Sequence, residues 1–117
     1  MTIYYSLRIE VGEELYSFIN TLLGVKSNSS SIWEIQFIQQ EHDIYISYID
    51  YFLSILEGKY RLLDTIGVTR EDISIWILYE YENQCNLEFS PTELTKIGVQ
   101  GITLCISCWE EDSLSTL

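Results

Sequence analysis

The chain has 117 residues, of which 18 are acidic and 6 are basic, so its formal net charge at pH 7 is −12. This charge disfavours direct binding to nucleic acid or to anionic lipid, because phosphate groups would be repelled. Hydrophobic residues make up 47% of the chain, which is enough for a self-sufficient core at this length. We therefore expect one domain over residues 1–112 and a flexible C-terminal tail at residues 113–117.

The sequence carries no targeting or membrane signal. No segment reaches the roughly 18 uninterrupted apolar residues of a membrane span, and no basic region followed by an apolar run opens the chain. A cytoplasmic location is expected. Three cysteines are an odd number in a chain that needs no covalent staples, so reduced thiols are expected as well.

The first three elements follow from changes of hydrophobic period. Residues 3–11 place an apolar side chain at every second position, which predicts a half-buried strand. Residues 13–23 change to helical spacing behind two glutamates that suit a helix N-terminus. After a polar loop, residues 33–37 alternate again and predict a second strand.

The middle of the chain predicts a long helix and then a hairpin. Helical spacing starts near Asp43 and weakens at Gly58, where a bend or break is expected before a last helical piece at 60–66. Residues 73–82 alternate strictly as a strand. A two-residue turn then leads to a second alternating stretch at 85–89, so the pair is predicted to form a hairpin.

A clear helix start follows the predicted hairpin. Ser90-Pro91-Thr92-Glu93 combines a capping hydroxyl, a proline at the first helical position and a glutamate three residues after the cap. The short helix is predicted to end at Gly98, and residues 102–108 alternate as a final strand.

One tripeptide pattern recurs three times and is interpreted as helix punctuation. Glycine can take the left-handed conformation after the last helical turn, and the apolar residue after it can fold back onto the helix. The three copies are Leu23-Gly24-Val25, Ile66-Gly67-Val68 and Ile97-Gly98-Val99.

The predicted order is strand, helix, strand, long helix, strand, strand, helix, strand. This order indicates an α+β fold with one mixed or largely antiparallel sheet of about five strands, helices on one face and a ferredoxin-like character. The order of the strands within the sheet is not predicted.

Metal, redox and nucleotide chemistry find little support. Cys105 and Cys108 have a spacing typical of redox or zinc sites, but residues three apart in a strand point to opposite faces. The glycines are isolated, so no phosphate-binding loop is predicted. No cofactor, metal ligand or catalytic residue is assigned. The alternative that stays open is a small-molecule-binding domain or hydrolase that uses His42, the only histidine, with nearby carboxylates.

Several aromatic residues lie on the polar sides of their strands. If all helices pack on one side, the other side of the sheet displays these residues together with carboxylates. Exposed aromatic side chains are typical of protein interfaces, although helices, a loop or a second copy of the chain could cover this face instead. The candidate partner-binding residues are Tyr4, Glu34, Trp76, Glu80, Glu82, Glu88 and Trp109, with Glu88 placed on this face by the predicted hairpin.

Three features cover most of the chain: Leu22-Leu23-Gly24-Val25 leading to Trp33, the long middle helix, and Phe89-Ser90-Pro91-Thr92-Glu93-Leu94 through Ile97-Gly98-Val99 to a closing strand. In these features the chain resembles a family of bacterial domains without an assigned function. The resemblance implies a small cytoplasmic α+β domain of the general kind found among bacterial immunity proteins that neutralise toxins. It carries over no functional residue.

The charge, the aromatic placement and the lack of catalytic motifs together predict a noncatalytic protein-protein interaction domain. The expected partner is a basic protein, for example a nuclease toxin neutralised by an immunity-type inhibitor. A homodimer paired through the aromatic face is a further alternative.

Overall fold

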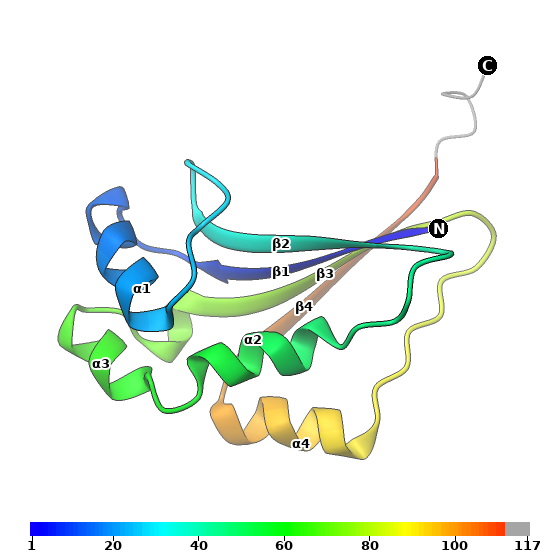
Figure 1. Ribbon diagram of the computed structural model, residues 1–117. Coiled ribbons are helices and arrows are strands. Elements are labelled where there is room, and N and C mark those ends of the chain that lie inside the picture. Colours follow the sequence, from blue (N-terminus) through cyan, green and yellow to red (C-terminus); the bar gives the residue numbers. More distant parts are fainter. Residues whose placement is uncertain (112–117) are drawn as a thin grey trace.

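Four strands and four α-helices make up the structure, a computed structural model that describes residues 1–111 (Figure 1). Two single-turn 3-10 helices, Glu13–Leu15 and Arg70–Asp72, precede α1 and β3. The predicted domain boundary at residue 112 and the predicted tail at 113–117 lie outside the described residues. In chain order the elements are β1 (Thr2–Ile9), α1 (Tyr16–Leu23), β2 (Trp33–Gln40), α2 (Tyr48–Leu56), α3 (Tyr60–Thr65), β3 (Ile73–Tyr81), α4 (Pro91–Gln100) and β4 (Thr103–Glu110).

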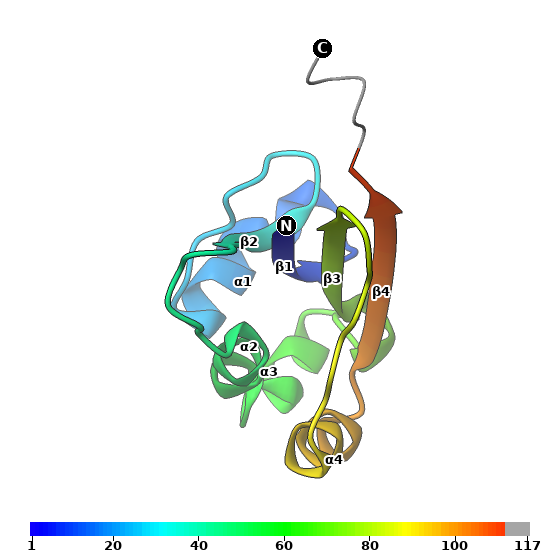
Figure 2. The same cartoon turned by 90° about the vertical axis from the view of Figure 1, so that its right-hand side faces the viewer.

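The strands form one mixed sheet in the order β2-β1-β3-β4. Strand β1 runs antiparallel to both β2 and β3, whereas β4 runs parallel to β3 and is reached through the crossover helix α4. Within residues 1–111, the helices pack on one face of the sheet, and the other face carries none (Figures 1 and 2). The predicted α+β class with a mixed sheet is therefore confirmed.

The predicted fifth strand is wrong. Residues 82–90, here called the strap, run extended along the helix side of the sheet from β3 to α4 and pair with no strand (Figure 2). Cys85, Leu87 and Phe89 pack against the core, which explains the alternating pattern. No hairpin can form, because both edges of β3 are already occupied by β1 and β4. Alternation reports burial on one side and says nothing about pairing.

The core lies between the sheet and the helices. Every second residue of β1 and β3 points into it, and Leu7, Ile75 and Phe52 are wholly buried there. Trp33, at the start of β2, is also wholly buried, and its indole nitrogen donates a hydrogen bond to the side-chain oxygen of Asn20 on α1 (2.8 Å). This bond satisfies the one polar atom of the largest buried side chain.

The helix predicted for the middle of the chain starts later in the structure than expected and is divided into two helices, α2 and α3. Helix α2 begins at Tyr48, after Ser47 caps it by accepting a hydrogen bond from the backbone N–H of Asp50, so the predicted start near Asp43 is wrong. Residues 44–46 are exposed in a loop although they are apolar. The predicted break at Gly58 is confirmed, because this residue has a φ of 77° between α2 and α3.

Two of the three predicted glycine exits are confirmed. Gly24 and Gly67 have φ values of 72° and 88°, each just after a helix. The third is wrong, because α4 continues through Gly98 and ends at Gly101, whose φ is 69°. Val99 is exposed and cannot fold back onto the helix, whereas Ile102 after Gly101 is buried and its N–H reaches the carbonyl of Ile97 (3.4 Å). The predicted cap at Ser90 is confirmed, since its hydroxyl accepts from the N–H of Glu93 (3.1 Å).

The two glycines of α4 are expected to respond oppositely to alanine. Gly98→Ala should raise the unfolding free energy by about 0.5–1 kcal/mol, because alanine favours a helix interior and its Cβ would meet no atom within 4 Å. Gly101→Ala should lower it by about 1 kcal/mol, because alanine is strained at positive φ. Urea unfolding of both variants measures the difference. Equal effects would contradict the helix end at Gly101.

Candidate functional site

The candidate site is the face of the sheet that no helix covers, here called the open face. Its side chains come from alternate positions of all four strands, opposite to those that fill the core. Five of the seven predicted partner-binding residues lie on it. The residues of the open face are Thr2, Tyr4, Ser6, Arg8, Glu34, Gln36, Ile38, Gln40, Ser74, Trp76, Leu78, Glu80, Thr103, Cys105, Ser107 and Trp109.

The strand register arranges this face in rows. Tyr4 lies between Ile38 of β2 and Leu78 of β3, which makes an apolar row across three strands. Glu80 lies opposite Trp109 of β4, so a carboxylate and an indole are neighbours at the end of the sheet. Trp109 is 40% exposed, which leaves a large part of its side chain available for contact.

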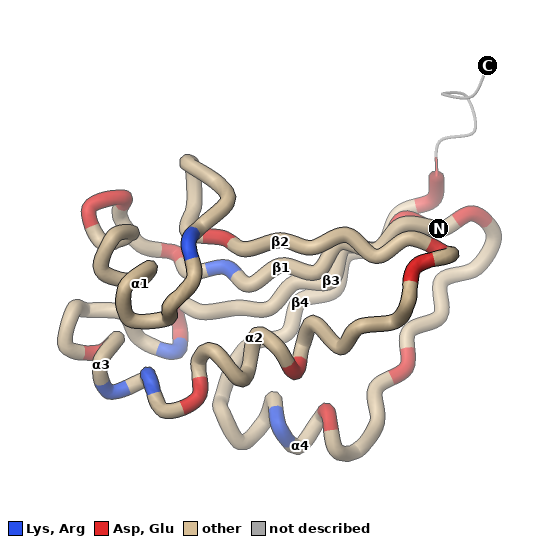
Figure 3. Tube along the Cα trace, in the orientation of Figure 1, with Lys and Arg blue, Asp and Glu red and all other residues tan. Residues whose placement is uncertain are grey.

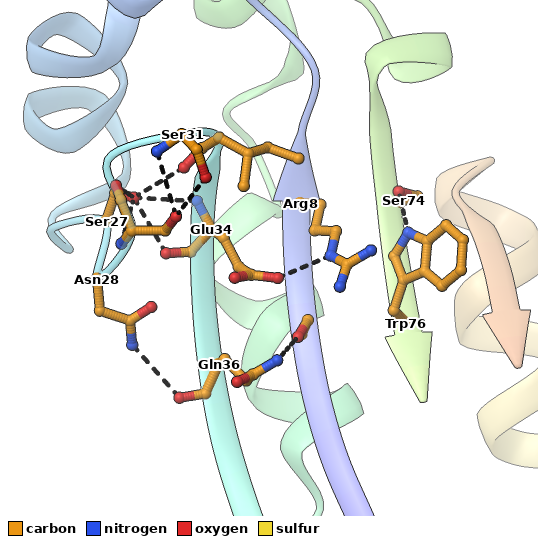
Figure 4. Close-up of polar contacts among 11 residues, drawn as sticks. Arg8, Ser27, Asn28, Ser31, Glu34, Gln36, Ser74 and Trp76 are labelled. Atoms are coloured by element: carbon orange, nitrogen blue, oxygen red, sulfur yellow. Dashed lines mark hydrogen bonds and ion pairs between the residues drawn. The ribbon is translucent and has the colours of Figure 1, made fainter. Parts of the chain in front are cut away.

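A charged cluster fixes the position of Trp76. The guanidinium of Arg8 donates from Nε to the carboxylate of Glu34 (2.7 Å) and lies 4.7 Å from the centre of the Trp76 ring (Figure 4). On its other side, the Trp76 indole nitrogen donates to the hydroxyl of Ser74 (2.9 Å). The only cation of the open face is therefore neutralised and holds an indole in place.

A small polar residue lies beneath these side chains. Ser6 is fully buried although it points to the open face, because larger side chains of the neighbouring strands close over it. Its hydroxyl accepts a hydrogen bond from the side-chain amide of Gln36 (2.9 Å, Figure 4). Sequence reasoning did not identify Ser6 or Gln36, since neither has a distinctive pattern.

The remaining two predicted residues lie elsewhere. Glu82 follows β3 directly and is exposed at the end of the sheet. Glu88 belongs to the strap, on the helix side of the sheet, where it lines a cavity of 170 Å³ with Tyr5, Ile77 and Phe89. Its predicted place on the open face is wrong, because that place depended on the hairpin that does not form.

One end of the molecule gathers carboxylates (Figure 3). It is the end where β1 begins and where the other three strands finish, according to the register. The six Lys and Arg residues of the chain lie away from it. We call this cluster the acidic end; its residues are Glu41, Asp43, Glu80, Glu82, Glu110 and Glu111.

A separate concave region lies beside α3 and the 3-10 helix Arg70–Asp72. It has a volume of 630 Å³ and is lined by Tyr60, Arg61, Asp64 and Arg70, among others, so cations and carboxylates alternate around it. The Arg70 guanidinium lies 4.2 Å from the Tyr60 ring centre, and burial raises the pKa of the Tyr60 phenol to about 12. The phenol donates a hydrogen bond to the side-chain oxygen of Gln100.

The alternative of a small-molecule-binding domain or hydrolase depends on His42. His42 is exposed in the turn after β2, and four cavities described by residues 1–111 are lined by other residues. No group of three or more potential metal ligands occurs in that part of the chain either.

The cysteines separate as their spacing predicts. Cys105 pairs with Trp76 on the open face, and Cys108 pairs with Tyr79 on the helix side. The sulfur of Cys108 lies 2.9 Å from the sulfur of Cys85 in the strap. The hydrogen bond from Cys85 to Cys108 raises the pKa of the Cys85 thiol.

None of the helices in residues 1–111 has the length and apolar character needed to cross a membrane. Comparisons of the chain with protein-family models, with curated proteins and with solved structures found no match.

Proposed function

We propose that this protein is a noncatalytic protein-binding domain that holds a basic protein partner on its open face and acidic end. One observation carries the proposal: an uncovered sheet face with ordered aromatic side chains runs directly into a cluster of carboxylates. Glu80 belongs to both regions, and Trp109 of the open face lies opposite it on β4, where the two regions meet.

The aromatic side chains supply the contact area. Interfaces obtain most of their energy from a few residues, and tryptophan and tyrosine are enriched among them. Trp76 is held by Arg8 and Ser74 before any partner arrives, so little side-chain entropy is lost when it is covered. Trp109 and Tyr4 extend the same surface on either side of it.

The carboxylates supply attraction and orientation. A surface of one sign steers an oppositely charged partner and speeds its encounter. The Lys and Arg residues lie away from the acidic end, where the one positive group is the N-terminal ammonium, 3.9 Å from a carboxylate oxygen of Glu82. The resulting charge gradient along the strands would orient a basic partner over Glu80 and Glu110.

A nuclease toxin is the kind of basic partner that fits this proposal, with the present chain as its immunity-type inhibitor in the bacterial cytoplasm. Nucleases carry basic surfaces that bind phosphate, and an acidic domain can occupy such a surface in place of the nucleic acid. The resemblance to small bacterial α+β domains of the immunity kind agrees with this proposal.

Affinity capture with matched variants tests the proposal. The wild-type chain is immobilised and exposed to extract of the source organism, beside Trp109→Ala and Glu80→Lys on the open face and Phe18→Ala and Glu57→Lys on the helix side. We expect a basic protein to be retained by the wild type and by both helix-side variants. Retention should fall at least about tenfold for each open-face variant, as expected for interface hot spots.

Two results would count against the proposal. One is that the wild type retains no basic protein. The other is that Trp109→Ala and Glu80→Lys retain the same protein as strongly as the helix-side variants, which would place the contact on another surface.

A further inference from the structure

The two edges of the sheet are protected very differently. On the β2 edge, the loop before the strand covers the outward-pointing backbone groups of Glu34. The N–H of Glu34 donates to the hydroxyl of Ser27 (3.0 Å), and its carbonyl accepts from the N–H of Asn28 (2.9 Å). Figure 4 shows this loop lying against the strand.

The same protection continues along β2. The side-chain amide of Asn28 donates to the carbonyl of Glu34 (3.0 Å), and its oxygen accepts from the N–H of Gln36 (3.3 Å). At the end of the strand, the N–H of Gln40 donates to the carboxylate of Asp43 (2.8 Å), and the carbonyl of Gln40 accepts from the N–H of Asp43 (3.1 Å). Groups of the flanking loops therefore occupy backbone groups of Glu34, Gln36 and Gln40 on this edge, which hinders pairing with another strand.

The β4 edge has none of these devices in the part of the chain that the structure describes. β4 is the last strand of the sheet, and no residue in the described range 1–111 bonds to the backbone of its outer edge. Its sequence, Thr103–Glu110, contains neither proline nor lysine, the residues that often block free edges. Ile106 is 45% exposed beside this edge, and Trp109 is exposed on the other face.

We propose that a second copy of this chain pairs its β4 antiparallel to β4, through the free edges of both. The placement of charges along β4 favours pairing with a second copy of the chain in the antiparallel direction. The carboxylates Glu110 and Glu111 lie at the C-terminal end of β4, whereas Arg70 lies at the other end, beside Gly101. Parallel pairing would bring Glu110 of the two copies together, and like charges across strands destabilise a sheet, whereas antiparallel pairing separates these carboxylates and brings each set to the end where Arg70 of the other copy lies.

The dimer has a defined geometry. The pairing is isologous, as in most homodimers, and joins four strands from each copy into one sheet of eight. A two-fold axis perpendicular to the sheet keeps both open faces on the same side. The dimer would therefore present two copies of the open face side by side. The pairing itself involves only this chain, so it stands or fails independently of the basic partner.

Sedimentation equilibrium of the purified chain tests the pairing. At about 0.1 mM we expect the wild type to show twice the mass of one chain, with a mass that decreases on dilution. Ile106→Lys and Ser107→Lys, on the two sides of β4, should each raise the dissociation constant at least about tenfold, because lysine on an edge strand opposes pairing.

The matched control is Ile38→Lys, because Ile38 is an isoleucine on the other edge strand with a similar exposure of 51%. This variant should leave the dissociation constant unchanged. On the unaltered chain, amide hydrogen exchange in β4 should slow as concentration rises, while exchange in β2 stays constant. A wild type with the mass of one chain at about 0.1 mM, or an Ile38→Lys effect as large as that of Ile106→Lys, would overturn the proposal.

Discussion

Replacing Trp33 with alanine is expected to lower the unfolding free energy by about 3–5 kcal/mol, the largest effect of any single change considered. Trp33 is wholly buried between the sheet and α1, so its loss leaves a cavity that the rigid sheet cannot fill. It would also leave the side-chain oxygen of Asn20 without the indole donor at 2.8 Å. Urea unfolding followed by far-UV circular dichroism measures the change.

Trp109→Ala provides the control, because it makes the same substitution at an exposed position on the same sheet. It should change the unfolding free energy by less than about 1 kcal/mol. If Trp33→Ala is no more destabilising than Trp109→Ala, the inward orientation of β2 is incorrect.

Replacing Arg8 with alanine is expected to have the second-largest effect, a loss of about 1–3 kcal/mol. The Glu34 side chain is only 13% exposed and would lose its charged partner, and Trp76 would lose the guanidinium beside it. A double-mutant cycle of Arg8→Ala and Glu34→Ala should give a coupling energy of about 1–2 kcal/mol. Salt should reduce this coupling only weakly, because the pair is partly buried.

The exposed ion pair between Lys96 and Asp50 supplies the comparison. Its side chains are 51% and 44% exposed, and 3.3 Å separates the charged atoms. The same cycle on this pair should give less than about 0.5 kcal/mol and should vanish in high salt. Equal couplings for the two pairs would mean that the Arg8–Glu34 contact does not order the open face.

Local patterns predicted the elements that depend on local physics. Strict alternation identified β1 and β3, and the Ser90–Glu93 capping box marked the start of α4. The failures needed information from elsewhere in the chain. The strap alternates as a strand does, but its pairing depended on whether an edge of β3 was free, and β4 had taken it. The helix ends at Gly101 and not at Gly98, because Ile102 after Gly101 is buried whereas Val99 after Gly98 is exposed.

The sequence predicted most of the residues that form the open face, but not the contacts among their side chains. Alternation alone placed Tyr4, Trp76 and Trp109 on one face once the helices lay on the other. The pairing of Arg8 with Glu34 could not be predicted, because it depends on the register of two strands separated by a helix. The protection of the β2 edge was hidden for the same reason, since it joins backbone atoms to a polar loop with no distinctive sequence.

Side-chain footprinting of the complex tests the central claim most directly. Hydroxyl radicals modify exposed aromatic side chains, so the protein is treated alone and when saturated with the basic partner that it retains. We expect modification of Trp109, Trp76 and Tyr4 to fall at least about fivefold on binding, as burial in an interface requires. Phe18 and Tyr45, which are exposed and lie off the open face, should react as before. Protection of Phe18 or Tyr45 with unchanged modification of Trp109 would contradict binding through the open face.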